Sequence, residues 1–133
     1  MKKLIIKIAL AIVIIGLAIG AIVLFNHINK AKKPKYDTEV NIIVYNIEEE
    51  IVSNKKFNGK DKTLFDLLND NYEIRYEESI YGVKLLDIDE IKTNFIDTFI
   101  AIYVDGVFST RGISYITLHD KILIELKESK VLS

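Results

Sequence analysis

The most apolar part of the chain is the run over residues 8–25, which contains eighteen residues and no polar side chain. As a helix this run is roughly 27 Å long, and extension back to Leu4, with Lys7 reaching outward, gives about 33 Å. These lengths match the thickness of a bilayer core, about 30 Å. The pattern therefore predicts a single transmembrane helix over about residues 4–26, with the lipid bilayer as its partner.

Small residues at 18–21 raise the alternative of a cleaved signal peptide, but the apolar run continues beyond them to Phe25. Signal peptides usually carry apolar regions of only about 7–15 residues, so an uncleaved signal anchor is favoured. Few residues precede the helix and about a hundred follow it, and long domains translocate largely regardless of charge. We therefore expect a single-pass cell-membrane protein with its domain outside the cell.

Charge divides the chain into the same two parts. Residues 1–35 contain seven lysines and no acidic residue, whereas residues 36–133 contain 11 Lys and Arg against 19 Asp and Glu, a net charge of −8. The basic part suits anionic lipid headgroups, and the acidic part repels phosphate backbones, which excludes nucleic acid as a partner. We expect an anchor and basic linker over 1–35 and an extracellular domain over 36–133.

Within the domain, apolar and polar residues alternate with period two in several short segments, the pattern of half-buried strands. Thr63 and Asp66 have the spacing of a capping box that opens one short helix. The run over residues 99–104 is apolar on both faces and is predicted to be the central strand, followed by the hairpin-turn pair Asp105 and Gly106. Strands are expected at 40–45, 47–57, 72–77, 83–88, 99–104, 107–109 and 122–127.

The order of these elements is two strands, one helix and then several strands. That order predicts the α+β class, specifically a β-grasp-like mixed sheet that curls over one helix, preceded by the single transmembrane helix. Another small α+β sandwich is the alternative.

Five segments carry a resemblance to a known family: VNIIVY, TLFDLL, ESIYGVKLLDID, IAIYVDGV and GISYITLHDKILIEL. The most telling is the cluster Ser79, Tyr81 and Gly82, followed by a strand and by an apolar run that ends at Asp105. In this order and spacing, residues 40–126 resemble the family related to the C-terminal domain of transcobalamin, which occurs in bacteria as an extracellular domain. The resemblance implies a β-grasp-like fold, and it is the only reason to consider a corrinoid ligand.

No catalytic or metal-binding pattern is evident. The chain has no cysteine, which excludes disulfides, thiol catalysis and zinc–thiolate sites. His27 and His119 are far apart in sequence, and neither a phosphate-binding loop nor a nucleophile elbow is present. Asp87 and Asp89 alternate on a strand and are expected on a solvated face. We therefore expect no enzyme activity, no metal and no cofactor.

A ligand-binding surface is expected near Ser79, Tyr81, Gly82, Asp105 and Phe108, from the family's motif positions and the exposure of turns. The leading hypothesis is a non-enzymatic extracellular module, tethered to the membrane, that captures a small ligand or docks a surface protein. The alternative is a structural or assembly accessory subunit of a membrane or cell-surface complex.

Pairing of two transmembrane helices would suit a structural or assembly accessory subunit. Gly16 and Gly20 have the spacing that lets two membrane helices pack closely, which suggests a weak helix dimer. Glycine is common in membrane helices, so a helix without such a partner is the other interpretation.

Overall fold

A computed structural model describes residues 31–80 and 82–131 of the chain. Within this part, no helix is both long and apolar enough to cross a bilayer. The helix expected over residues 4–26, including Gly16 and Gly20, lies outside the described residues. The membrane anchor and the helix dimer therefore stay predictions, and the fold is that of the domain beyond them.

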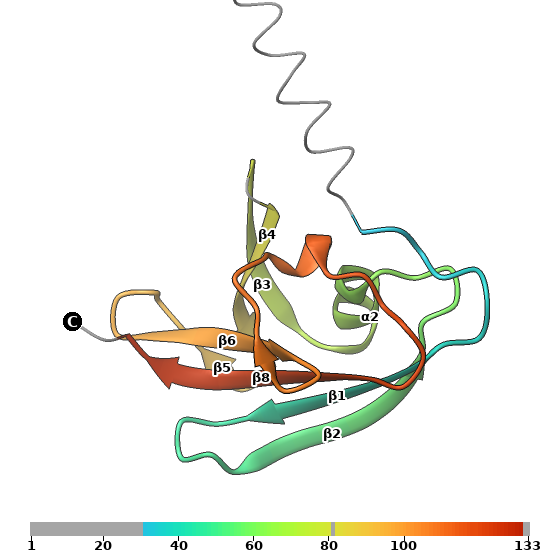
Figure 1. The fold of residues 1–133 in the computed structure, drawn as a ribbon. Helices are drawn as coiled ribbons and strands as arrows, with labels where there is room; N and C mark the ends of the chain where they lie inside the picture. Colours follow the sequence, from blue (N-terminus) through green and yellow to red (C-terminus); the bar gives the residue numbers. More distant parts are fainter. Residues whose placement is uncertain (1–30, 81, 132–133) are drawn as a thin grey trace, which may run out of the picture. The chain divides into compact units, whose positions relative to one another are not determined.

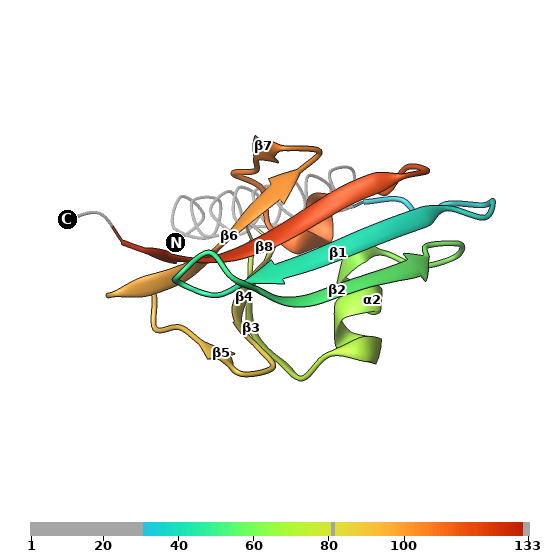
Figure 2. The ribbon, with the colours of Figure 1, turned by 90° about the horizontal axis from the view of Figure 1, so that it is seen from below.

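A five-stranded mixed sheet forms one layer of the domain, in the order β2-β1-β8-β6-β7 (Figure 1). Strand β1 pairs in parallel with β8, and the other neighbours pair antiparallel. The strands are β1 (Glu39–Tyr45), β2 (Ile51–Asn58), β6 (Thr98–Val104), β7 (Val107–Phe108) and β8 (Ile122–Lys130). Figure 2 shows this sheet from the face opposite α2 and the small sheet.

Helix α2 and a second, smaller sheet form the other layer, over the inner face of the large sheet (Figure 1). The small sheet has the order β3-β4-β5. Its strands are β3 (Ile74–Ser79), β4 (Gly82–Ile88) and β5 (Ile91–Lys92), and the layer also holds α2 (Leu64–Asn71) and the 3-10 helix η1 (Ile113–Tyr115). The α+β class, with a mixed sheet and one α-helix in the described part, is confirmed.

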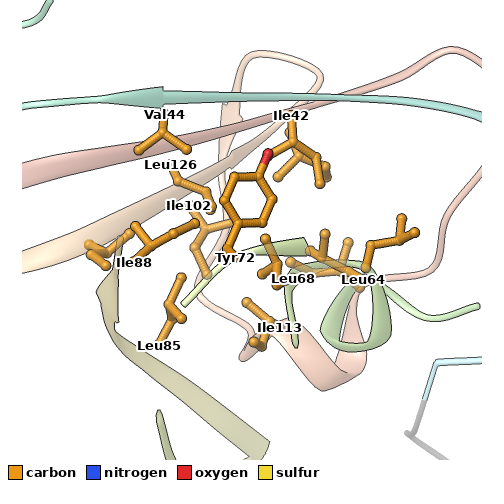
Figure 3. Packing of buried hydrophobic residues seen from close by; sticks show 14 of the residues in the cluster. Ile42, Val44, Leu64, Leu68, Tyr72, Leu85, Ile88, Ile102, Ile113 and Leu126 are labelled. Atoms are coloured by element: carbon orange, nitrogen blue, oxygen red, sulfur yellow. The ribbon is translucent and has the colours of Figure 1, made fainter. Parts of the chain in front are cut away.

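The core lies between the two layers, and Figure 3 shows its packing. The apolar face expected for the helix is confirmed, because Leu64, Leu67 and Leu68 are all buried. Each fully buried leucine or isoleucine contributes about 1.5–3 kcal/mol relative to an exposed one. Side chains from both layers meet here, including Ile42, Val44, Leu64, Leu68, Leu85, Ile88, Ile102, Ile113 and Leu126.

Three expectations about the strands are wrong. The segments near 72–77 and 83–88 form a separate sheet instead of extending the large one, and β8, not β6, is the middle strand of the large sheet. Strand β2 begins at Ile51 because residues 46–50 form a turn. In that turn, the Asn46 side chain accepts hydrogen bonds from the backbone N–H groups of Glu48 and Glu50.

Candidate functional site

A groove lies between two strand edges that short neighbouring strands leave open. Strand β7 pairs with only Tyr103 and Val104 of β6, and β5 pairs with only Asp87 and Ile88 of β4. The remaining edges of β4 and β6 border a cavity of about 450 Å³. Residues that line it come from β4, β6 and the adjoining loops: Ser79, Gly82, Val83, Lys84, Leu85, Phe95, Phe99, Ile100, Ala101, Ile102, Phe108, Ser109, Thr110, Arg111 and Gly112.

Aromatic side chains give the groove its apolar walls. The ring centroids of Phe95 and Phe99 are 6.1 Å apart, and Phe108 packs edge-on against Tyr103 at 5.6 Å. Phe95 has a φ of 59°, unusual for a bulky residue, in a turn where the Asn94 side chain accepts backbone hydrogen bonds from the residues that follow. The turn therefore fixes the position of this phenylalanine at the groove.

Two glycines allow the segment after β7 to pack against β4. A Cβ atom at Gly112 would lie 2.7 Å from the carbonyl oxygen of Val83, and a Cβ at Gly82 would lie 2.7 Å from the ring of Tyr115. Gly82 also has a φ of +103°, a conformation that favours glycine. The backbone N–H of Val83 donates a hydrogen bond to Ser114 Oγ at 3.1 Å. These contacts hold the segment after β7 beside β4, where Gly82, Val83 and Gly112 line the groove.

Among the described residues of the groove lining, the charged ones are Lys84 and Arg111, and none is Asp or Glu. The ammonium nitrogen of Lys84 lies 3.8 Å from the ring centroid of Phe95, a cation–π contact. Both residues are exposed. These two cations, together with Phe95 and Phe99, are groove residues that the sequence pattern did not predict. The one available signal was Phe95, an aromatic residue inside a polar loop.

The structure brings three of the five expected site residues to the groove and separates a fourth from them. Ser79, Gly82 and Phe108 line the groove. Tyr81 lies outside the described residues. Asp105 is not among the lining residues, and its carboxylate is held instead by His119 and by the backbone N–H of Leu123.

The pair Asp105 and His119 forms an exposed ionic contact, with Nε2 of the imidazole 2.6 Å from Oδ2 of the carboxylate. Hydrogen bonds from the Leu123 N–H and from His119 hold the pKa of Asp105 below its usual value. The backbone carbonyl of Asp120 and the Asp105 carboxylate raise the pKa of His119. In the described part of the chain, no group of three or more acidic or histidine side chains is placed to hold a metal ion.

The expectation that Asp87 lies on a solvated face is wrong. Asp87 is buried, and Arg75 donates two hydrogen bonds to its carboxylate, at 2.7 and 3.1 Å. The backbone N–H of Thr93 donates a third, at 3.0 Å. The Arg75 contact, followed by the Thr93 bond, lowers the pKa of Asp87. Its carboxylate therefore fixes β3, β4 and the turn after β5, whereas the exposed Asp89 accepts a hydrogen bond from the backbone N–H of Glu73.

A second hollow, of about 520 Å³, lies near the C-terminal ends of β1 and β8. Two of its charged lining residues already have partners: the ammonium of Lys127 is 3.8 Å from Glu125 Oε2 and 4.6 Å from the ring centroid of Tyr103, and Glu128 accepts a hydrogen bond from the Ile47 N–H. Its lining is also far more polar than that of the first groove. The groove between β4 and β6 is the better candidate, because apolar walls with a few polar groups are typical of small-molecule sites.

Comparisons with known proteins find similarity at the level of structure alone. No family model matches the chain, and no curated protein does. A proposed metal-binding protein from Ruminococcus gnavus ATCC 29149 has a similar crystal structure, with a TM-score of 0.64 and 16% identity over 72% of this chain and all of that one. Haptocorrin in complex with Cbi matches with a TM-score of 0.56 and 18% identity over 74% of this chain. These likenesses concern the fold. The match spans only 26% of the haptocorrin chain.

Proposed function

We propose that this chain is a non-enzymatic binding module that captures a small ligand in the groove between β4 and β6. The observation that carries the proposal is the groove itself, an apolar hollow of about 450 Å³ with phenylalanine walls and two open strand edges. Ligand pockets are typically about 300–1,000 Å³ and mostly apolar. The N-terminal helix would hold the module at the outer surface of the cell membrane, where a tethered domain meets ligands before they enter the cell.

Two further observations support a binding role. Among the described residues of the groove lining there is no His, Asp or Glu, the side chains most used as general bases to activate a serine nucleophile. The structural neighbours are a proposed metal-binding protein and haptocorrin, whose structure contains Cbi, so this kind of fold supports ligand binding in other chains. Corrinoids therefore belong in the first set of compounds to test.

The β-grasp-like description and the kinship with the transcobalamin C-terminal domain are part of the same proposal. Their support is the parallel pairing of β1 with β8, flanked by a hairpin on one side and β6 on the other. The likeness to haptocorrin at a TM-score of 0.56 points in the same direction. The extracellular location rests on the N-terminal apolar run and the length of the domain after it.

The test is a ligand screen on the full chain in nanodiscs, using ligand-observed NMR with corrinoids and a set of small metabolites. Thr110 is exposed at the groove, so Thr110→Trp is expected to block the groove. The affinity of a ligand that binds there should fall by at least about tenfold, or 1.4 kcal/mol. Thr117→Trp adds the same bulk at an exposed threonine outside the groove and should leave affinity unchanged. The proposal fails if no compound binds, or if binding is unaffected by Thr110→Trp.

A further inference from the structure

We infer that the groove selects small amphipathic anions, compounds with a compact apolar body and one carboxylate, phosphate or sulfonate group. The inference rests on the proposed function and names the ligand class for the same site. Its basis is the coincidence of three features in one place: two cations, an absence of acidic lining residues and phenylalanine walls.

The local charge of the groove opposes the charge of the domain. Residues 36–133 carry a net charge of −8, yet the lining residues contribute Lys84 and Arg111 and no carboxylate. A cleft lined by one sign of charge attracts ligands of the opposite sign, and its low-dielectric walls strengthen that attraction. Divalent cations are disfavoured at such a groove for the same reason.

Both cations are available to a ligand. Neither Lys84 nor Arg111 has a carboxylate of the described residues within ion-pair distance, in contrast to Arg75, which is committed to Asp87. Other exposed lysines of the domain are also unpaired, so the absence of a partner alone decides nothing. What distinguishes Lys84 and Arg111 is that they border the same apolar cavity.

The two cations differ in what they offer to an anion. The backbone N–H of Arg111 donates to Ser109 Oγ at 3.2 Å, and the N–H of Ser109 donates to the carbonyl of Ile102 at 2.8 Å, so the loop that carries Arg111 is tied to the edge of β6. A guanidinium matches the two oxygens of a carboxylate or phosphate. The Lys84 ammonium rests over the Phe95 ring, which places positive charge beside an apolar wall.

The phenylalanines provide the complementary apolar contact. Phe95 and Phe99 contact each other in the groove lining, and Phe108, which is 49% exposed, also lines the groove. An aromatic body buried among such rings gains both area and ring contacts. A ligand with a ring and an acidic group therefore uses every feature of the groove, whereas a neutral ring leaves the two cations without a partner.

The test compares naphthalene-2-carboxylate with naphthalene-2-carboxamide, which share a ring and differ in charge. Each is titrated by calorimetry into the full chain in phosphatidylcholine nanodiscs at low salt, with empty nanodiscs as the blank. We expect the carboxylate to bind about tenfold more tightly, because bonds to a charged group are stronger than neutral ones. The double variant Lys84→Gln, Arg111→Gln should remove this preference, so that the two compounds bind with equal affinity.

The matched control is Lys60→Gln, Lys121→Gln, which makes the same change in net charge at exposed residues outside the groove lining. The preference for the carboxylate should survive in this variant. If both double variants lose the preference for the carboxylate equally, the inference is overturned, because the net charge of the domain would then explain the preference. Equal affinity of the two compounds, blocked by Thr110→Trp, also overturns it but leaves the small-ligand function standing. Failure of both compounds to bind overturns the anion inference, while the wider screen tests the function independently.

Discussion

At the scale of single residues, the clearest change of role concerns Asp105. Its position before Gly106 suggests a turn, and the family resemblance suggests a ligand-binding role. The structure supports the turn, since Asp105 and Gly106 have φ values of 51° and 84°, as a type I′ hairpin requires. The carboxylate fastens this turn to Leu123 at the start of β8 and to His119. The Asp105 carboxylate thus links the turn after β6 to β8, and its expected part in ligand binding stays a prediction.

His119 should make folding stability depend on pH. Both of its ring nitrogens face acceptors, the Asp120 carbonyl at 3.0 Å and the Asp105 carboxylate at 2.6 Å, so the protonated imidazolium satisfies both. Because the pKa of His119 is raised in the folded state, this residue stabilises the fold fully at pH values below its ordinary pKa of 6.5. This contribution is lost as the pH rises through the folded-state pKa. Because the pKa of Asp105 is lowered in the folded state, this residue stabilises the fold at pH values above its ordinary pKa of 3.8. This contribution is lost as the pH falls through the folded-state pKa.

The contribution of Asp105 and His119 to folding stability is therefore largest at mildly acidic pH, between their ordinary pKa values of 3.8 and 6.5. Because both side chains are partly exposed, it should be below about 1 kcal/mol. In Asp105→Asn, the decrease in the urea midpoint between pH 5.5 and pH 8 should be smaller than in the unmodified chain. Asp61→Asn is the control, since Asp61 also has a positive φ, of 58°, without a histidine partner among the described residues. An unchanged pH dependence in Asp105→Asn would contradict the assignment.

At the scale of elements, local signals account for the helix and tertiary pairing accounts for the groove. Helix α2 has only eight residues, too few to be stable alone, so its cap and its buried leucines must act together. The capping box expected from Thr63 and Asp66 is confirmed: Thr63 Oγ1 accepts from the Asp66 N–H at 3.1 Å, and Asp66 Oδ2 accepts from the Thr63 N–H at 2.9 Å. By contrast, nothing in the local sequence limits β5 and β7 to two residues each.

Removal of the cap oxygen should destabilise the domain measurably. Thr63→Ala leaves the N–H of Asp66 without its side-chain acceptor at the N-terminus of α2, which should lower the free energy of unfolding by about 1 kcal/mol. Thr63→Ser retains the hydroxyl and should recover most of this loss. Thr117→Ala, at an exposed threonine, provides the baseline in the same urea titration. A Thr63→Ala value equal to that baseline would show that the cap contributes nothing.

At the scale of the whole molecule, the segment between β7 and η1 approaches β4 closely where Gly112 passes the β4 backbone. Gly112 has an ordinary negative φ of −64°, so its importance lies in the space around it and not in its backbone angle. A Cβ there would lie 2.7 Å from the Val83 carbonyl oxygen, closer than real contacts allow. The segment after β7 can therefore lie against β4 only because this residue is glycine, and that contact shapes one end of the groove.

Gly112→Ala should lower the free energy of unfolding by about 1–3 kcal/mol, the usual cost of forcing extra volume into a packed site. The change should also weaken ligand binding in the groove, because the loop with Arg111 must move away from β4. Gly106→Ala is the comparison, since nothing lies within 4 Å of a Cβ at Gly106 and only its positive φ resists substitution. Urea midpoints and amide NMR shifts of Val83 distinguish the two. A Gly112→Ala domain with unshifted Val83 and full stability would refute the close approach.

The sequence by itself determined the features that depend on near neighbours: the alternation of β1 and β8, the capping box, and the turn at Asp105 and Gly106. These depend on residues a few positions apart, whose propensities and hydrogen bonds act locally. It also determined the α+β class and the split between a basic N-terminal part and an acidic domain. The anchor, the location and the ligand inferred from those patterns stay predictions.

Only the tertiary structure decided which strands share a sheet, which strand lies in the middle, and where edges stay open. Sheet membership depends on backbone partners far apart in the chain, such as Val40 with Ile122, and alternation alone does not identify the partner. The burial of Asp87 and the meeting of Lys84 with Phe95 follow from the same distant pairings. The groove exists because β5 and β7 pair with only two residues each and leave the rest of the β4 and β6 edges open. The packing of the two layers brings these open edges to the same cavity.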